Sequence, residues 1–195
     1  EAGNFEHGTT NPVLLADFET RQKLAPQREK VLAARQERTP PGKDTKQLTF
    51  WNALTIRGLA RAAQAFGEAA WFELAQGAAE CLWARMVSGE GAQTHLQAVY
   101  YDKADAAEGQ AGPREDGRLD DYAAFAEAWL ALAETAELHE AGLAATCIDR
   151  ARQLAAAIHA RFRDPDGHGC FYTDEQAAAK LIARQKDWLD NGVPA

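Results

Sequence analysis

Two adjacent carboxylates and a phenol, Asp120, Asp121 and Tyr122, stand at the start of a helical pattern. A carboxylate shielded by aromatic neighbours can act as a general acid or base, so Asp121 is the candidate catalytic residue and Tyr122 a candidate substrate-binding residue. The same positions have a structural interpretation, because Asp is a preferred N-cap and a first-turn carboxylate interacts favourably with the helix dipole. The sequence leaves both interpretations open.

A second candidate pair, Trp51 and Asn52, occupies the matching place in an earlier helical pattern. An indole face stacks on the apolar face of a sugar, and an amide both donates hydrogen bonds to hydroxyl groups and accepts them. The pair therefore predicts carbohydrate binding. Its structural alternative is a core tryptophan beside a capping asparagine.

Charged pairs lie in the loops that lead into these helices. Asp44 and Lys46 precede Trp51, and Lys186 and Asp187 lie in a loop that would precede a further helix. Oppositely charged residues on loops are usually solvated pairs that contribute little. If the helices line the inside of a barrel, however, these loops share its mouth, and all four residues are candidate substrate-binding residues.

Helical periodicity predicts the elements that must position these side chains. Helices are expected at 17–38 with a break at Pro26, 49–66, 69–87, 119–137 and 140–163. A short strand is expected at 95–101, a polar loop at 103–118, and short β-like pieces at 170–173 and 180–184. The short connections make 49–87 and 119–163 two antiparallel helical hairpins.

The hairpins repeat one plan, which is typical of a helical solenoid or toroid. The first helix of each pair is rich in small residues without a clean polar face, as an inner helix should be, and the second carries more charge. The predicted fold is all-α: a partial (α/α)6 barrel built of helical hairpins with short β connections. We expect one fragment of such a domain, with a leading loop and helix at 1–47, a first hairpin and connection at 48–118, and a second at 119–195. The sequence begins with Glu1 rather than Met and stops in turn-like residues at 190–195, so we expect both ends to be cut from a longer ring.

Composition narrows the class of protein. The chain has 195 residues, a formal charge of −8 and 42 alanines, about a fifth of the total. It contains no apolar run long enough for a membrane span and no basic run suited to nucleic acid, so neither partner is expected. Three widely spaced cysteines favour a reducing cytoplasm over a disulfide framework. Histidine spacing suggests no metal site, and no phosphate loop or dinucleotide motif is present, so we expect no cofactor.

Short motifs then follow one another in a particular order. They lie at 4–11, 35–46, 48–54, 119–123 and 186–194. Their order and spacing resemble the C-terminal region of thioredoxin-domain-containing proteins of the spermatogenesis-associated protein 20 type, and the resemblance covers almost the whole chain. That region is similar in fold to the six-hairpin glycosidases and the N-acylglucosamine 2-epimerases. The chain departs from the family pattern at Thr45, where a second Asp is usual, and at Asp120, where Glu is usual.

The resemblance implies a carbohydrate-binding or carbohydrate-modifying role, epimerase-like or glycoside-hydrolase-like, with a small carbohydrate as ligand. It also adds His7, in the first motif, as a candidate catalytic residue, since epimerase-type relatives transfer protons through histidine. The alternative is a non-catalytic helical scaffold attached to a thioredoxin-like redox domain in the full-length protein. Whether the chain is an enzyme stays open. A catalytic role would require Asp44, Asp121 and Asp187 to converge on one substrate.

Overall fold

A computed structural model describes Leu15 and residues 17–102, 111–136, 142–167, 169–179 and 182–186. The chain divides into two compact units, Glu1–Lys43 and Asp44–Ala195. Each unit is described by itself below.

The first unit contains helices α1 (Phe18–Lys23) and α2 (Ala25–Gln36). Asp17 caps α1 by accepting a hydrogen bond from the backbone N–H of Thr20 at 2.8 Å. Pro26 lies in the first turn of α2, where its missing N–H is not needed, so the predicted break is confirmed. Neither helix has a buried residue.

The second unit is built around two helical hairpins. The first consists of α3 (Thr49–Phe66) and α4 (Ala69–Met86), and the second of α5 (Leu119–Ala136) and α6 (Leu143–Arg161). Gly67 ends α3 in the left-handed conformation, with φ of +70°, and its N–H donates to the carbonyl oxygen of Ala63. These four helices confirm the predicted hairpins to within a few residues at each end.

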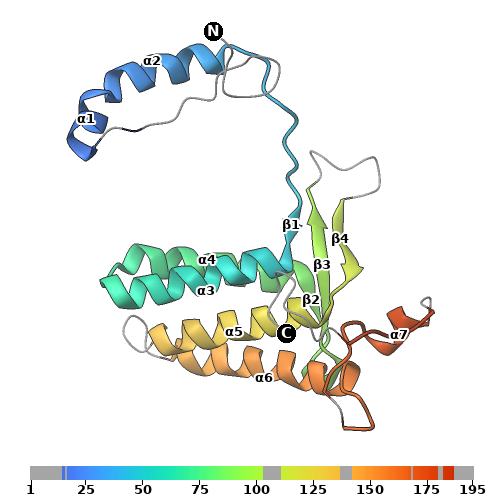
Figure 1. Cartoon of the computed structure of the whole chain (residues 1–195). Helices are drawn as coiled ribbons and strands as arrows, with labels where there is room; N and C mark the ends of the chain where they lie inside the picture. Colours follow the sequence, from blue (N-terminus) through green and yellow to red (C-terminus); the bar gives the residue numbers. More distant parts are fainter. Residues whose placement is uncertain are drawn as a thin grey trace. The chain divides into compact units, whose positions relative to one another are not determined.

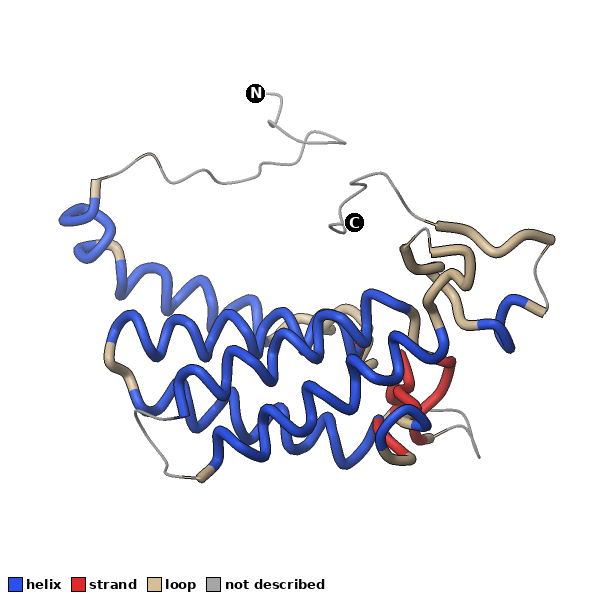
Figure 2. The backbone as a smooth tube through the Cα atoms, turned by 90° about the horizontal axis from the view of Figure 1, so that it is seen from below, coloured by secondary structure: helices blue, strands red, loops and turns tan. Residues whose placement is uncertain are grey.

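Helix α5 is the centre of the core, because it packs against α3 on one side and α6 on the other (Figure 1). Its buried residues come from all parts of the helix and include Tyr122, Phe125, Trp129 and Leu132, all fully buried. Within the second unit, Figure 2 shows the four long helices α3 to α6 running alongside one another, with the strands gathered at one end. The first residues of α3 and α5 lie at that end.

A small antiparallel sheet accompanies the helices. Its strands are β1 (Gln47–Leu48), β2 (Val87–Ser88), β3 (His95–Tyr101) and β4 (Gly112–Asp116). Strand β3 pairs with each of the other three, so the strand predicted at 95–101 is confirmed. The protein is thus mostly helical with a small sheet.

Two local predictions were wrong in detail. The polar segment expected to be a loop contains β4, which pairs with β3 from Gln97↔Asp116 to Tyr101↔Gly112. Its hydrogen-bond partner is distant in sequence, and backbone pairing does not require apolar side chains. The β-like piece expected at 170–173 contributes only one isolated bridge, between Arg163 and Cys170.

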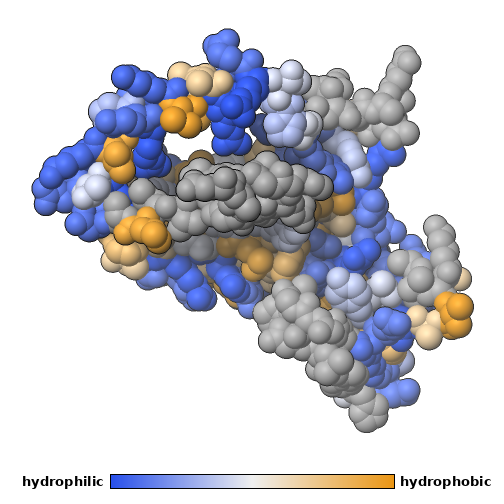
Figure 3. All heavy atoms as spheres, turned by 45° about the horizontal axis from the view of Figure 1, so that its top comes forward, coloured by the Kyte–Doolittle hydropathy of each residue, from blue (hydrophilic) through white to orange (hydrophobic). Residues whose placement is uncertain are grey.

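One side of α3 is uncovered in the described part of the chain. Trp51, Leu54, Gly58 and Ala65, spaced along one stripe of the helix, are all exposed. Figure 3 shows hydrophobic residues as orange patches among hydrophilic surface on one face of the molecule. Across the described residues, no helix is both long and apolar enough to cross a membrane.

Candidate functional site

Asp121 joins the first turns of α3 and α5. Its Oδ1 accepts a hydrogen bond from the backbone N–H of Phe50 at 3.1 Å, and its Oδ2 accepts one from the N–H of Arg118 at 2.9 Å. The side chain is only 5% exposed. One carboxylate therefore satisfies N–H groups at the starts of two helices that lie 71 residues apart in sequence.

Burial raises the pKa of the Asp121 carboxyl from an ordinary 3.8 to about 6, and the nearby charge of Asp120 acts in the same direction. The two backbone N–H groups oppose this shift because they stabilise the charged form. The pKa is in the range of a general acid, but both oxygens are engaged and almost no surface is open to a ligand. The structure gives Asp121 a positioning role, and the catalytic role stays a prediction.

Beside Asp121 lies a more accessible polar group made of Asp120, Tyr172 and Arg118. The hydroxyl of Tyr172 donates to Asp120 Oδ2 at 3.2 Å, while Asp120 Oδ1 accepts from the N–H of Asp121 at 3.1 Å. The guanidinium of Arg118 lies 5.7 Å from the centre of the Tyr172 ring. Burial raises the pKa of Tyr172, so its hydroxyl remains a donor at neutral pH.

Sequence reasoning missed Tyr172 and Arg118. Arg118 directly precedes the 119–123 motif that contains Asp120, and this position next to the motif was the only feature of the sequence that could have identified it. Tyr172 is 52 residues from Asp120, and no spacing rule connects them. The backbone brings them together, since the N–H of Leu119 donates to the carbonyl oxygen of Tyr172 at 3.0 Å.

Trp51 lies in the first turn of α3 with 65% of its surface exposed. It is not a core residue, so its indole is available to a ligand. The side-chain amide of Asn52, half-buried, donates to the carbonyl oxygen of Leu48 at 2.7 Å. At least one hydrogen bond of the Asn52 side chain therefore stabilises the start of α3.

Tyr122 lies in the core. It has no exposed surface, its hydroxyl accepts a hydrogen bond from the N–H of Leu96 at 2.8 Å, and its ring is 5.2 Å from that of Phe162. This side chain holds β3 against α5. In the described conformation it has no surface to offer a ligand.

The loop before α3 holds an exposed ion pair, in which Lys46 Nζ lies 3.0 Å from Asp44 Oδ2. The hydrogen bond from Lys46 lowers the pKa of Asp44, and the pair raises the pKa of Lys46. Lys46 also lies 6.0 Å from the centre of the Tyr101 ring. No described contact links this pair to Asp121.

Lys186 forms an ion pair with the buried Asp164 and lies 4.9 Å from the centre of the Phe171 ring. Its charge is thus used to hold the segment that follows α6. Asp187 and His7 lie outside the described residues. Among the residues that are described, no three His, Cys, Asp or Glu side chains are grouped as metal ligands would be.

Comparison with known proteins agrees with the motifs. No protein-family model matches the chain. The chain is 28% identical over 167 residues to spermatogenesis-associated protein 20 of Mus musculus, and equally to that of Homo sapiens. The match covers 86% of this chain and 20% of each relative, so the chain spans about a fifth of their length. The resemblance inferred from the motifs is confirmed.

Proposed function

We propose that the second unit is part of an (α/α)6 barrel similar to that of the six-hairpin glycosidases, and that the end where α3 and α5 begin binds a small carbohydrate. The observation that carries the proposal is Trp51, an indole 65% exposed in a helix turn that is tied through Asp121 to the polar group of Asp120 and Tyr172.

The barrel is supported by the difference between α3 and α5. Helix α5 has buried residues along its whole length, whereas α3, which packs against α4 and α5, leaves the stripe containing Trp51, Leu54 and Gly58 exposed. Small and apolar exposed residues are what a further hairpin would cover. The relatives, about five times longer than the matched region, leave room for such hairpins.

Carbohydrate binding is supported by the combination of groups at this end. Trp51 offers an aromatic face, Asp120 a partly exposed carboxylate, Tyr172 a hydroxyl oxygen that can accept a hydrogen bond, and Arg118 guanidinium donors. The Asp121 carboxylate bonds to backbone N–H groups on both helices, so these side chains are held in a fixed relation. Polar groups held in fixed positions beside an exposed indole can recognise a sugar, which is a rigid ring with several hydroxyl groups.

The test is a thermal-unfolding scan of the chain with millimolar monosaccharides, disaccharides and amino sugars. A ligand that binds only the folded state raises the unfolding temperature. Trp51→Ala should abolish the shift caused by the active sugar. Trp71→Ala is the matched control, because Trp71 is also partly exposed, at 39%, but lies at the opposite end of the first hairpin. If the sugar raised the unfolding temperatures of the two variants equally, its binding site would not lie at the end where α3 and α5 begin.

The second candidate is a non-catalytic scaffold that carries a thioredoxin-like domain in the full-length protein. It is favoured by Asp121, whose two oxygens are both occupied by backbone N–H groups. The same scan separates the two proposals. A cooperative transition that no sugar shifts would favour the scaffold.

A further inference from the structure

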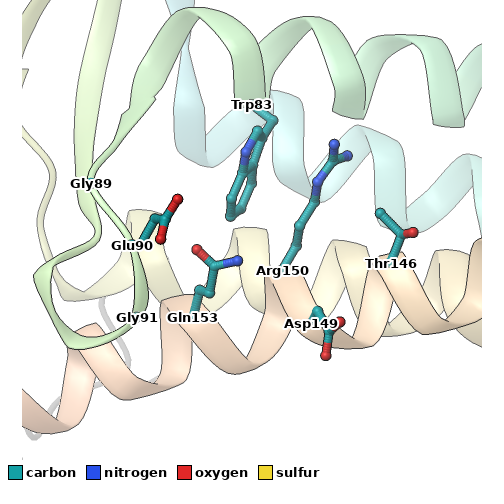
Figure 4. A pocket seen from close by; sticks show the side chains of 8 residues that line it. All are labelled: Trp83, Gly89, Glu90, Gly91, Thr146, Asp149, Arg150 and Gln153. Atoms are coloured by element: carbon teal, nitrogen blue, oxygen red, sulfur yellow. The ribbon is translucent and has the colours of Figure 1, made fainter.

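A hollow of about 500 Å³ lies between α4 and α6, beside the turn that joins β2 to the short 3₁₀ helix η2 (Gly91–Gln93). Figure 4 shows the side chains around it. They include Trp83 from α4, Glu90 from the turn, and Asp149, Arg150 and Gln153 from α6. None of the residues considered so far as a site lines this hollow.

Trp83 is held in place from several directions. Arg150 Nη1 lies 2.5 Å from Glu80 Oε1, an ion pair that ties α6 to α4. The guanidinium carbon of Arg150 is 5.1 Å from the centre of the Trp83 ring and 4.4 Å from that of Trp129. Trp83 also packs edge-on against Trp129, with ring centres 5.8 Å apart. The half-buried indole therefore presents a fixed surface to the hollow.

The turn that carries Glu90 is also fixed. Gly89 has φ of +75°, and a Cβ added there would lie 2.4 Å from the carbonyl oxygen of Gln93. Only glycine allows this close approach. In Figure 4 the ring of Trp83 stands with Glu90 and Gln153 on one side and Arg150 on the other. A ligand beside the indole would thus meet a carboxylate and an amide.

The charges of the hollow are unequal. The charge of Arg150 is met by Glu80, which does not line the hollow. Asp149 is 3.6 Å from Arg152, but both side chains are more than two-thirds exposed, so this contact contributes little. Glu90 has no ion pair within the part of the chain that the structure describes. The carboxylate of Glu90 therefore supplies negative charge on the side of the Trp83 ring opposite Arg150 (Figure 4).

We propose that this hollow binds a small organic ammonium ion, with its alkyl groups against the side of the Trp83 ring that faces Glu90 and its charge near the Glu90 carboxylate. An aromatic face attracts a cation through the negative potential of its π system, and the nearby carboxylate of Glu90 adds to that attraction. Anions are disfavoured at the same place, in a chain whose formal charge is −8. The inference does not depend on the proposed carbohydrate site.

The test is a titration of the chain with choline. Binding is monitored by calorimetry and by the indole N–H signals in NMR. The uncharged carbon isostere of choline, in which carbon replaces nitrogen, is the control ligand, because it has the same shape without the charge. We expect saturable binding of choline and none of the isostere. Glu90→Gln should weaken choline binding about two- to fivefold, as for a partly exposed charge pair.

Glu73→Gln is the matched control, since Glu73 is an exposed carboxylate of α4 outside the hollow. It should leave choline binding unchanged. Equal binding of choline and its isostere, choline binding that is insensitive to Glu90→Gln, or no saturable choline binding would each overturn the proposal. A sugar that displaces choline from the wild-type chain would also overturn it, because the hollow would then be a site for hydroxyl groups.

Discussion

Ionisation of Asp121 should destabilise the folded chain as the pH rises from 3.8 to about 6. Burial raises the pKa of its carboxyl, so between these two values the folded state holds a proton that the unfolded state has already lost. The free energy of unfolding must then fall as the pH rises. The contribution is fully present below the unfolded pKa and fully lost above the folded one. A pKa of about 6 against 3.8 corresponds to about 3 kcal/mol.

The measurement is urea denaturation of the wild type and Asp121→Asn across this pH range. The amide does not titrate, so the difference in free energy of unfolding between the two proteins isolates Asp121 from the other carboxylates. We expect that difference to decrease by about 2 kcal/mol between about pH 4 and pH 7, whatever its absolute value, because part of the contribution is already lost at pH 4. The absolute value is not the test, because an amide can accept only one of the two backbone hydrogen bonds.

Asp120→Asn provides an internal control. The charge of Asp120 contributes to the raised pKa of Asp121, so its removal should lower that pKa and make the pH-dependent decrease smaller. A difference between wild type and Asp121→Asn that stays flat with pH, or that increases with pH, would refute the reasoning. It would mean that the N–H groups of Phe50 and Arg118 stabilise the charge more than burial opposes it.

Two further predictions concern the scaffold, and both are read from the free energy of unfolding in urea. Gly89→Ala should lower the free energy of unfolding by about 3 kcal/mol, because the new Cβ would clash with the Gln93 carbonyl oxygen in a left-handed turn. Gly67→Ala is the control: it has the same left-handed backbone but open space around the new Cβ, and should lower the free energy of unfolding by about 1 kcal/mol. Equal decreases in the two variants would contradict the clash at Gly89. Leu132→Ala, at a fully buried position of α5, should cost about 3 kcal/mol, and Leu130→Ala, 46% exposed on the same helix, less than about 1 kcal/mol. If Leu130→Ala lowered the free energy of unfolding more than Leu132→Ala, the face of α5 described as buried would be the wrong one.

The helices and their ends followed from local rules. Periodic apolar residues, Pro26 in a first helical turn and Gly67 at a helix end act over a few residues, so the sequence predicts the hairpins without knowledge of their partners. Strand β3 was equally readable from Val99, Tyr100 and Tyr101, because β-branched and aromatic residues favour strands. Strand β4 was not, because a polar segment becomes a strand only when an open edge is available for pairing.

Which candidate side chain meets solvent was decided by tertiary packing. Trp51 and Tyr122 hold matching places at the starts of two helices, yet Trp51 is 65% exposed and Tyr122 is fully buried. The difference arises because Leu96 of β3 and Phe162 pack against Tyr122, whereas Trp51 lies on the side of α3 that no described element covers. A single sequence shows which face of a helix is apolar, but it does not show which other elements will cover that face.

The sequence by itself determined a helical-hairpin protein, its likeness to spermatogenesis-associated protein 20 and the helix starts that carry its polar residues. Only the tertiary structure decided how those residues are used. Asp121 bonds to Phe50 across 71 residues, Tyr172 bonds to Asp120 across 52, and Arg150 stacks on Trp83 from another helix. Such contacts depend on the distance between elements in space, and local residue patterns carry no record of that distance.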